Sequence, residues 1–318
     1  MRPVDRRSAI FGGMAVAAVA ASPGRAQTVG LEILSAGKPG DGDDQLARAV
    51  AEGFGVTELL PRAVAVNVER DAEALSEFLD GKRPRAALMV IGLSSVGMLL
   101  ATRAPNKLSE CRPVARLIGE RQPIVVQAAS PYRTIDDLMT AIRRDTASVT
   151  WTGRPIGGAD HQLALLLTKA AGGDMARLSY RPADSAAQAS YWALKGETQV
   201  ATGPLIEYAA QILGGTLRAL ALASPDRAPG LDTPTLKEQG VDLAMINWRG
   251  VASRASVGQA LIDRFGQATM TVSGYKGWGQ LLQQRFWSNL YEDGASFERF
   301  IAEETTRVSA LLSEARVI

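Results

Sequence analysis

The stretch KPGDGDDQLAR, residues 38–48, combines features that favour anion binding with features that oppose it. Gly40 and Gly42 lie just before a helix that the spacing predicts from about Asp43. Amide N–H groups at a helix N-terminus carry partial positive charge, and glycine lets a ligand approach them closely. However, the same turn carries three carboxylates, those of Asp41, Asp43 and Asp44. The turn is therefore a candidate ligand site whose own charge restricts what it can hold.

A second turn of this kind is GRPIGGADH, residues 153–161. Gly157 and Gly158 precede a helix that is expected from about Ala159. Either turn alone could be an ordinary connection between a strand and a helix. Two such turns in a chain without an obvious catalytic set suggest a ligand that is held between two lobes.

The residue inventory argues against an enzyme. His161 is the only histidine and Cys111 the only cysteine, so no disulfide can form within the chain. The sequence has no metal-ligand spacing, no GxSxG elbow and no phosphate loop that ends in Gly-Lys-Ser/Thr. We therefore expect no catalytic residue, no metal and no cofactor, and we expect His161 to pack or to orient its loop. A hydrolase or transferase that uses Lys or carboxylates stays an alternative, which turnover would reveal.

Strand-like and helix-like segments alternate along most of the chain. This alternation predicts an α/β protein with parallel-rich sheets that helices cover on both faces. From Val257 the chain is expected to be mostly helical, and Ser296 is a candidate cap for the last helix, 296–315. Expected strands include 30–36, 62–68, 86–92, 123–130, 198–203 and 217–224, and expected helices include 134–145, capped by Thr134, and 158–173.

The N-terminal segment has the composition of an export signal. Its basic start contains Arg6 and Arg7, an apolar stretch follows from Ala9 to Ala21, and small residues precede Gln27. This pattern indicates a signal over 1–26 that resembles the twin-arginine type, and hence a periplasmic protein. Its removal would change Lys+Arg from 35 to 31 and Asp+Glu from 33 to 32, which gives a net charge near −1.

The composition is that of a folded domain. The chain has 318 residues with 46% apolar and 21% charged side chains, enough for one large core or two smaller ones. Nothing indicates a basic face for nucleic acid, and no membrane-spanning helix is expected past the N-terminus.

Further segments carry a resemblance to a known family, namely GGADHQLALLLTKAAG (157–172), NWRGV (247–251) and LRALALASPDRAPGLDTPTLKEQGVDL (217–243), of which the last is the most specific match. Through these segments the chain resembles the substrate-binding proteins of tripartite tricarboxylate transporters, the Bug or TctC family. The first turn is similar to the family's Pro-Gly-Gly-Gly-x-Asp-x-x-Ala-Arg loop at Pro39, Gly40, Gly42, Asp44, Ala47 and Arg48.

The resemblance implies a two-lobed periplasmic binding protein with two crossover strands. The first lobe would comprise 27–122 plus 225–318, and the second lobe 123–224. In relatives, a small carboxylate lies in the cleft and is held by backbone amides and waters from both loops rather than by an arginine clamp. The resemblance implies ligand contacts at Gly40, Gly42, Asp44, Gly157, Gly158 and Asp160, with Thr202 and Gly203 as further candidates at the end of a strand near the cleft. Asp41 and Asp43 are added as candidates because of the charge of the first turn, not because of the resemblance.

The partners implied are a small organic acid or amino acid and the membrane subunits of a transporter, and we expect a monomer. A periplasmic protein of the same fold that senses a ligand for a receptor is the alternative. The chain departs from the family pattern at VNVERDAEA (66–74), YRPADSAAQ (180–188) and ASRAS (252–256), so we expect a different pocket shape.

The carboxylates of the first turn lead to a hypothesis about the ligand. Asp44 matches the family and can cap backbone amides, whereas relatives have Gly at the position of Asp41 and commonly Thr at that of Asp43. These two side chains either point to solvent or lower the potential at the mouth of the cleft. In the second case the protein prefers a ligand of low net negative charge, with an amine or another cationic group near Asp41 or Asp43.

Overall fold

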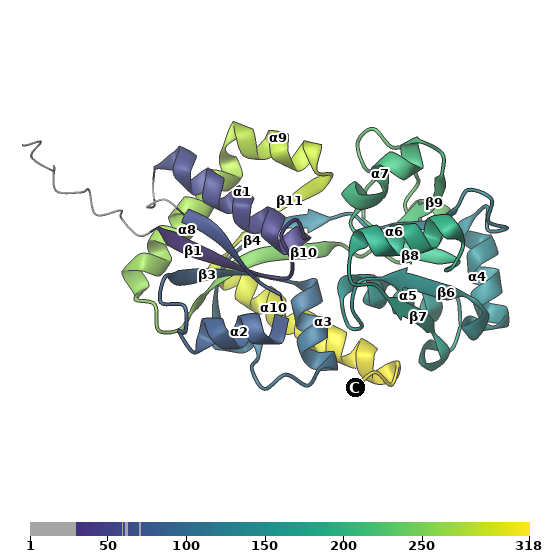
Figure 1. Ribbon diagram of the computed structural model, residues 1–318, viewed down its shortest axis with the longest axis horizontal. Helices are drawn as coiled ribbons and strands as arrows, with labels where there is room; N and C mark the ends of the chain where they lie inside the picture. Colours follow the sequence, from purple (N-terminus) through teal and green to yellow (C-terminus); the bar gives the residue numbers. More distant parts are fainter. Residues whose placement is uncertain (1–29, 59, 61–62, 70) are drawn as a thin grey trace, which may run out of the picture.

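The computed structural model describes residues 30–58, 60, 63–69 and 71–318 and has two lobes, each built around one β-sheet (Figure 1). The predicted export signal, 1–26, lies outside the described residues. The lobe limits predicted from the sequence stay a prediction, and the lobes are defined below by their sheets. Within the described part of the chain, no helix has the length and apolar character needed to cross a membrane.

The first lobe contains a six-stranded sheet in the order β11-β4-β10-β3-β1-β2. Its strands are β1 (Leu31–Ala36), β2 (Ala63–Val68), β3 (Ala86–Gly92), β4 (Cys111–Glu120), β10 (Asn247–Arg254) and β11 (Trp287–Asp293). Its helices are α1 (Gly42–Thr57), α2 (Asp71–Leu79), α3 (Leu93–Ala101), α8 (Gln259–Gly274), α9 (Lys276–Gln284) and α10 (Gly294–Glu314), and a short 3-10 helix, η1 (Leu108–Glu110), precedes β4.

The second lobe contains a five-stranded sheet in the order β7-β6-β8-β5-β9. Its strands are β5 (Pro123–Gln127), β6 (Thr150–Gly153), β7 (Ser179–Pro182), β8 (Val200–Thr202) and β9 (Leu217–Leu222). Its helices are α4 (Ile135–Arg144), α5 (Ala159–Ala170), α6 (Ala186–Lys195) and α7 (Leu205–Leu213).

Strand direction follows the connections. The strands joined through helices, β1 to β3 and β6 to β8, run parallel, as the alternation predicts. The strands next to the crossings are reversed, since β10 is antiparallel to β3 and β4, and β5 is antiparallel to β8 and β9. The sheets are therefore parallel-rich and mixed, and the carboxyl ends of β1, β2, β3, β6 and β7 carry the loops that face the other lobe.

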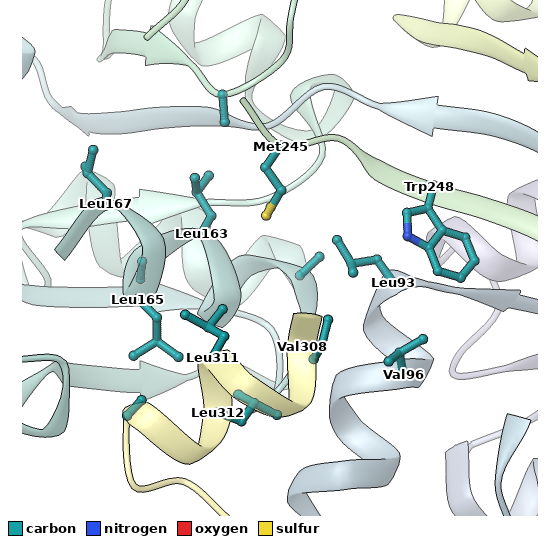
Figure 2. Close-up of a cluster of buried hydrophobic side chains, with 14 of the residues drawn as sticks. Leu93, Val96, Leu163, Leu165, Leu167, Met245, Trp248, Val308, Leu311 and Leu312 are labelled. Carbon is teal, nitrogen blue, oxygen red and sulfur yellow. The ribbon is translucent and has the colours of Figure 1, made fainter. Parts of the chain in front are cut away.

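The chain crosses between the lobes twice, from β4 to β5 and from β9 to β10, so that each crossing joins a strand of one sheet to a strand of the other. The end of α10 adds a third contact, because Val308, Leu311 and Leu312 belong to the same apolar cluster as Leu163 and Leu167 of α5 (Figure 2). The Lys169 ammonium also lies 2.6 Å from the Glu314 carboxylate. The C-terminal helix thus packs on the second lobe although it starts in the first.

Several local predictions are confirmed and others are corrected. Thr134 caps α4, since its hydroxyl accepts a hydrogen bond from the Asp137 amide at 3.1 Å. The prediction of a mostly helical tail is incomplete because β11 lies within it. The last helix begins at Gly294, and Asp293 rather than Ser296 is its cap, because the Asp293 carboxylate accepts from the Ser296 amide at 2.8 Å.

Candidate ligand-binding site

A cavity of about 120 Å³ lies between the two lobes, at the ends of the loops that follow the parallel strands. Ligands of open α/β sheets bind outside the carboxyl ends of the strands, so this position is the expected one. The first lobe contributes Ala36, Gly37, Lys38, Asp41, Asp43, Glu69, Ser94, Met98 and Arg249 to the wall, and the second contributes Arg154, Pro155, Gly158 and Asp184.

The first turn is organised by Asp44, as the sequence suggested. The Asp44 carboxylate accepts hydrogen bonds from the Gly40 amide and from Arg48 Nε, both at 2.8 Å. Burial acts to raise the pKa of Asp44, but the hydrogen bonds from Arg48 and Gly40 outweigh it and leave the pKa lowered. Gly40 and Asp44 therefore shape the turn, and neither residue lines the cavity.

Asp41 connects the lobes. One carboxylate oxygen accepts from the Lys38 amide at 3.0 Å, and the other lies 2.8 Å from the guanidinium of Arg154 in the second lobe. Arg154 follows directly after β6, at its carboxyl end. Both side chains are about three-quarters buried, and the ion pair forms part of the cavity wall.

Asp43 belongs to a buried charge cluster with Arg249 of β10. Arg249 Nε lies 2.5 Å from Asp43 Oδ1, and the same guanidinium contacts the Glu120 carboxylate. Burial raises the pKa of Asp43, and the guanidinium opposes this shift. A Cβ atom at Gly42 would collide with the guanidinium, so Gly42 is required for the packing of Arg249 on the start of α1.

The second turn packs against the first lobe. Gly157 has a φ of +86°, and a Cβ atom there would lie 2.5 Å from the Gly97 carbonyl oxygen of α3. Its amide donates to His161 Nδ1 at 3.2 Å, the Gly158 amide donates to the Pro155 carbonyl oxygen at 2.9 Å, and the Ala159 amide donates to Ser94 Oγ at 3.2 Å. The amides at residues 157–159 thus already have protein acceptors.

His161 holds this turn, in agreement with its predicted role. Its ring is buried and stands edge-on to Tyr180 at a centroid distance of 4.7 Å. Burial lowers the pKa of His161 to about 4, so the imidazole is neutral and Nδ1 can accept the Gly157 amide.

Asp160 lies behind the cavity rather than in its wall. Its carboxylate accepts from Gln122 Nε2 at 2.6 Å and from the Arg154 amide at 2.8 Å. Gln122 is part of the first crossing between the lobes, and burial raises the pKa of Asp160. Asp160 therefore fixes the position of Arg154 relative to the crossing segment.

Thr202 is the last residue of β8 and Gly203 follows it, and neither residue lines the cavity. The Thr202 carbonyl accepts from the Tyr208 hydroxyl at 3.3 Å, and a Cβ atom at Gly203 would lie 3.4 Å from the Glu207 carboxylate. Burial raises the pKa of Glu207 to about 8, although Arg154 opposes this shift. Direct ligand contact by these two residues stays a prediction.

The structure therefore divides the predicted site residues into two groups. Asp41, Asp43 and Gly158 line the cavity, whereas Gly40, Gly42, Asp44, Gly157 and Asp160 hold the turns and the crossing, and Thr202 and Gly203 lie at the end of β8. Sequence reasoning missed the two cavity arginines, Arg154 and Arg249. Two signals were present, since Arg154 lies inside the second glycine turn and Arg249 inside the family-like NWRGV segment.

The cavity wall carries nearly balanced charge. Counted as ionised, it has three cationic side chains and four carboxylates. The guanidiniums of Arg154 and Arg249 each have a carboxylate partner. The carboxylates of Glu69 and Asp184 have no ion-pair partner among the described residues.

Residues 100–317 match the family described as "Tripartite tricarboxylate transporter family receptor". The chain belongs to the TctC family. The predicted family and the two-lobed fold class are thereby confirmed, and both are those of binding proteins.

Solved structures of similar proteins share the fold of this TctC chain. A TctC solute binding protein from Polaromonas has 21% identity and a TM-score of 0.69, with 89% of this chain and 98% of that chain covered. MatC from Rhodopseudomonas palustris with bound malate has 15% identity and a TM-score of 0.74, with 89% and 98% covered. An R. palustris protein with adipate has 16% identity and a TM-score of 0.77, with 90% and 97% covered. None of the curated proteins compared with the chain matches it.

Proposed function

We propose that this TctC protein captures a small carboxylate-containing metabolite in the interlobe cavity and delivers it to a tripartite tricarboxylate-type membrane transporter. The observation that carries the proposal is the cavity itself, which lies at the carboxyl ends of strands from both lobes and has Arg154 and Arg249 in its wall. Arginine is well suited to carboxylates because its fork of N–H groups matches their geometry. The malate and the adipate of the two R. palustris structures support this ligand class.

Direct contacts between the lobes support a role for closure. The Asp41–Arg154 ion pair, the bond from the Ala159 amide to Ser94 and the approach of Gly157 to Gly97 all join loops of opposite lobes. Each of these contacts breaks if the lobes separate about a hinge. Closure around a ligand would then produce the surface that a membrane partner recognises.

The charges of the wall define the ligand class more narrowly. Both arginines are already matched by protein carboxylates, so a citrate-like trianion would meet no excess positive charge. We infer that the protein prefers a monocarboxylate or an amino acid. A ligand amine would face Glu69 and Asp184 rather than Asp41 and Asp43, because the latter two are ion-paired.

Calorimetric titrations of the purified protein test this proposal. Citrate, succinate and alanine are compared on the wild type and on Asp41→Asn, which keeps the side-chain shape but releases Arg154. We expect the wild type to bind alanine more tightly than citrate, and the variant to gain affinity for succinate and citrate. If the wild type binds citrate most tightly and the variant does not change this order, the inferred ligand class is wrong.

We also propose that the chain is exported to the periplasm by the twin-arginine route and works as a monomer. The arginine pair and the mild apolar stretch of residues 1–26 support the route, and the family of binding proteins supports the destination. Fractionation of cells that express the full chain, followed by size-exclusion chromatography of the processed protein, tests both points.

A further inference from the structure

A larger cavity, of about 390 Å³, lies within the first lobe and away from the interlobe loops. Its walls come from α3, from the segment that contains η1 and from α10. Its volume is in the range of roughly 300–1,000 Å³ that small-molecule sites occupy. Apolar side chains form most of its wall, among them Val96, Leu99, Leu100, Leu108, Ile301 and Ala302.

This cavity is separate from the interlobe site although both use α3. Ser94 and Met98 of α3 line the interlobe cavity, whereas Val96, Leu99 and Leu100 line the larger one. The two cavities therefore lie on different faces of one helix, and the residues of the proposed carboxylate site do not form part of the apolar wall.

The charged side chains of the larger cavity are not balanced. Arg103 at the end of α3 and Lys107 before η1 are exposed and form no ion pair with another described residue. Glu298 of α10 is the carboxylate among the lining residues. Among its lining residues the wall thus combines a mostly apolar surface with one more cation than carboxylate, and the Glu110 carboxylate, which accepts from the Lys107 amide at 2.6 Å, lies beside this edge.

We propose that this cavity is a second binding site, for an amphipathic anion with an apolar chain or ring and a single carboxylate. The apolar part of such a ligand would be removed from water against α3 and α10, which is favourable in proportion to the area covered. Its carboxylate would remain at the solvent edge near Arg103 and Lys107, where it needs little desolvation. This proposal stands independently of the function proposed for the interlobe cavity.

The test is calorimetric titration of the purified full chain with octanoate as the probe and with 1-octanol as its uncharged counterpart. We expect saturable one-to-one binding of octanoate to the wild type and weaker binding of octanol. An exposed ion pair contributes a factor of about 1.4 to 5, so the double variant Arg103→Gln/Lys107→Gln, which removes two, should bind octanoate roughly 2- to 25-fold more weakly. Glu298→Gln is the matched charge control and should bind octanoate at least as tightly as the wild type.

Two further variants locate the site. Ala302→Phe places a ring from an exposed position of α10 into the cavity and should abolish octanoate binding, while thermal unfolding verifies that the variant is folded. Because octanoate is itself a monocarboxylate, Arg154→Gln distinguishes the two sites: octanoate bound in the larger cavity should keep its affinity in this variant, whereas a loss of affinity would place octanoate in the interlobe cavity and overturn the proposal. The proposal is overturned if the binding of octanoate does not saturate, if octanol binds with the same affinity as octanoate, or if the folded Ala302→Phe variant binds octanoate with the affinity of the wild type.

Discussion

The ion pair between Asp41 and Arg154 should make a measurable contribution to holding the lobes together. Its N–O distance is 2.8 Å and its side chains are 20% and 26% exposed. Two unit charges about 4 Å apart attract by ~4 kcal/mol at an effective dielectric constant near 20, and by ~2 kcal/mol near 40. Ordering the two side chains opposes this by ~1 kcal/mol or more. We therefore expect a coupling free energy of about 1–2 kcal/mol, or roughly 5- to 30-fold in an equilibrium constant.

A double-mutant cycle on the free energy of unfolding in urea measures this coupling, with Asp41→Asn, Arg154→Gln and their combination. The control is a cycle on Arg181 and Glu197, which form a 3.1 Å ion pair inside the second lobe with side chains 45% and 42% exposed. An exposed pair of that kind should give a coupling of roughly 0.2–1 kcal/mol. A coupling of Asp41 with Arg154 that does not exceed the control would refute the argument that the interlobe pair stabilises the closed form.

Four further predictions follow from single sites. Burial raises the pKa of Glu207 from 4.5 to about 8, so its stabilising contribution is complete below about pH 4.5 and is lost as the pH rises towards 8. The unfolding free energy of the wild type should therefore fall relative to Glu207→Gln between these pH values, and parallel pH profiles would contradict this. Arg249→Met leaves the buried carboxylates of Asp43 and Glu120 without their cation and should lower the unfolding free energy by about 3–5 kcal/mol. A loss below about 1 kcal/mol would contradict the assignment of these three residues to one buried charge cluster. Gly157→Val should weaken binding of the interlobe ligand by about tenfold or more, since the valine side chain would collide with the Gly97 carbonyl oxygen of α3 and keep the two lobes apart. Gly172→Val is the matched control, because Gly172 has a φ of +78° but no atom within 4 Å of an added Cβ, and equal affinities of both variants would rule out this explanation. Replacing the Arg6–Arg7 pair by lysines should leave the precursor in the cytoplasm, and normal processing would contradict the twin-arginine route.

The local parts of the site could be predicted from the sequence because they depend on neighbours in the chain. The cap that Asp44 provides acts on an amide four residues away, and the contact between His161 and Gly157 spans the same separation. Residue type and helix periodicity carry this information.

The electrostatic partners could not be predicted because they are distant in the sequence. Asp41 and Arg154 are 113 residues apart, and Asp43 and Arg249 are 206 residues apart. No local periodicity encodes such pairs, so the carboxylates of the first turn appeared unpaired. The strand β11 was missed for a related reason, since its largely polar sequence forms an edge strand only through pairing with β4.

The central claim is that the interlobe cavity is the ligand site of this TctC protein. The most direct measurement is calorimetric titration of the wild type and of Arg154→Gln with the low-charge carboxylate that binds the wild type most tightly. Because Arg154 lies in the cavity wall, we expect a one-to-one complex whose affinity falls by about tenfold or more in the variant, in line with the ~1.5–3 kcal/mol of a hydrogen bond to a charged group. Equal affinity of the wild type and a folded Arg154→Gln variant would show that the ligand binds elsewhere and would contradict the account.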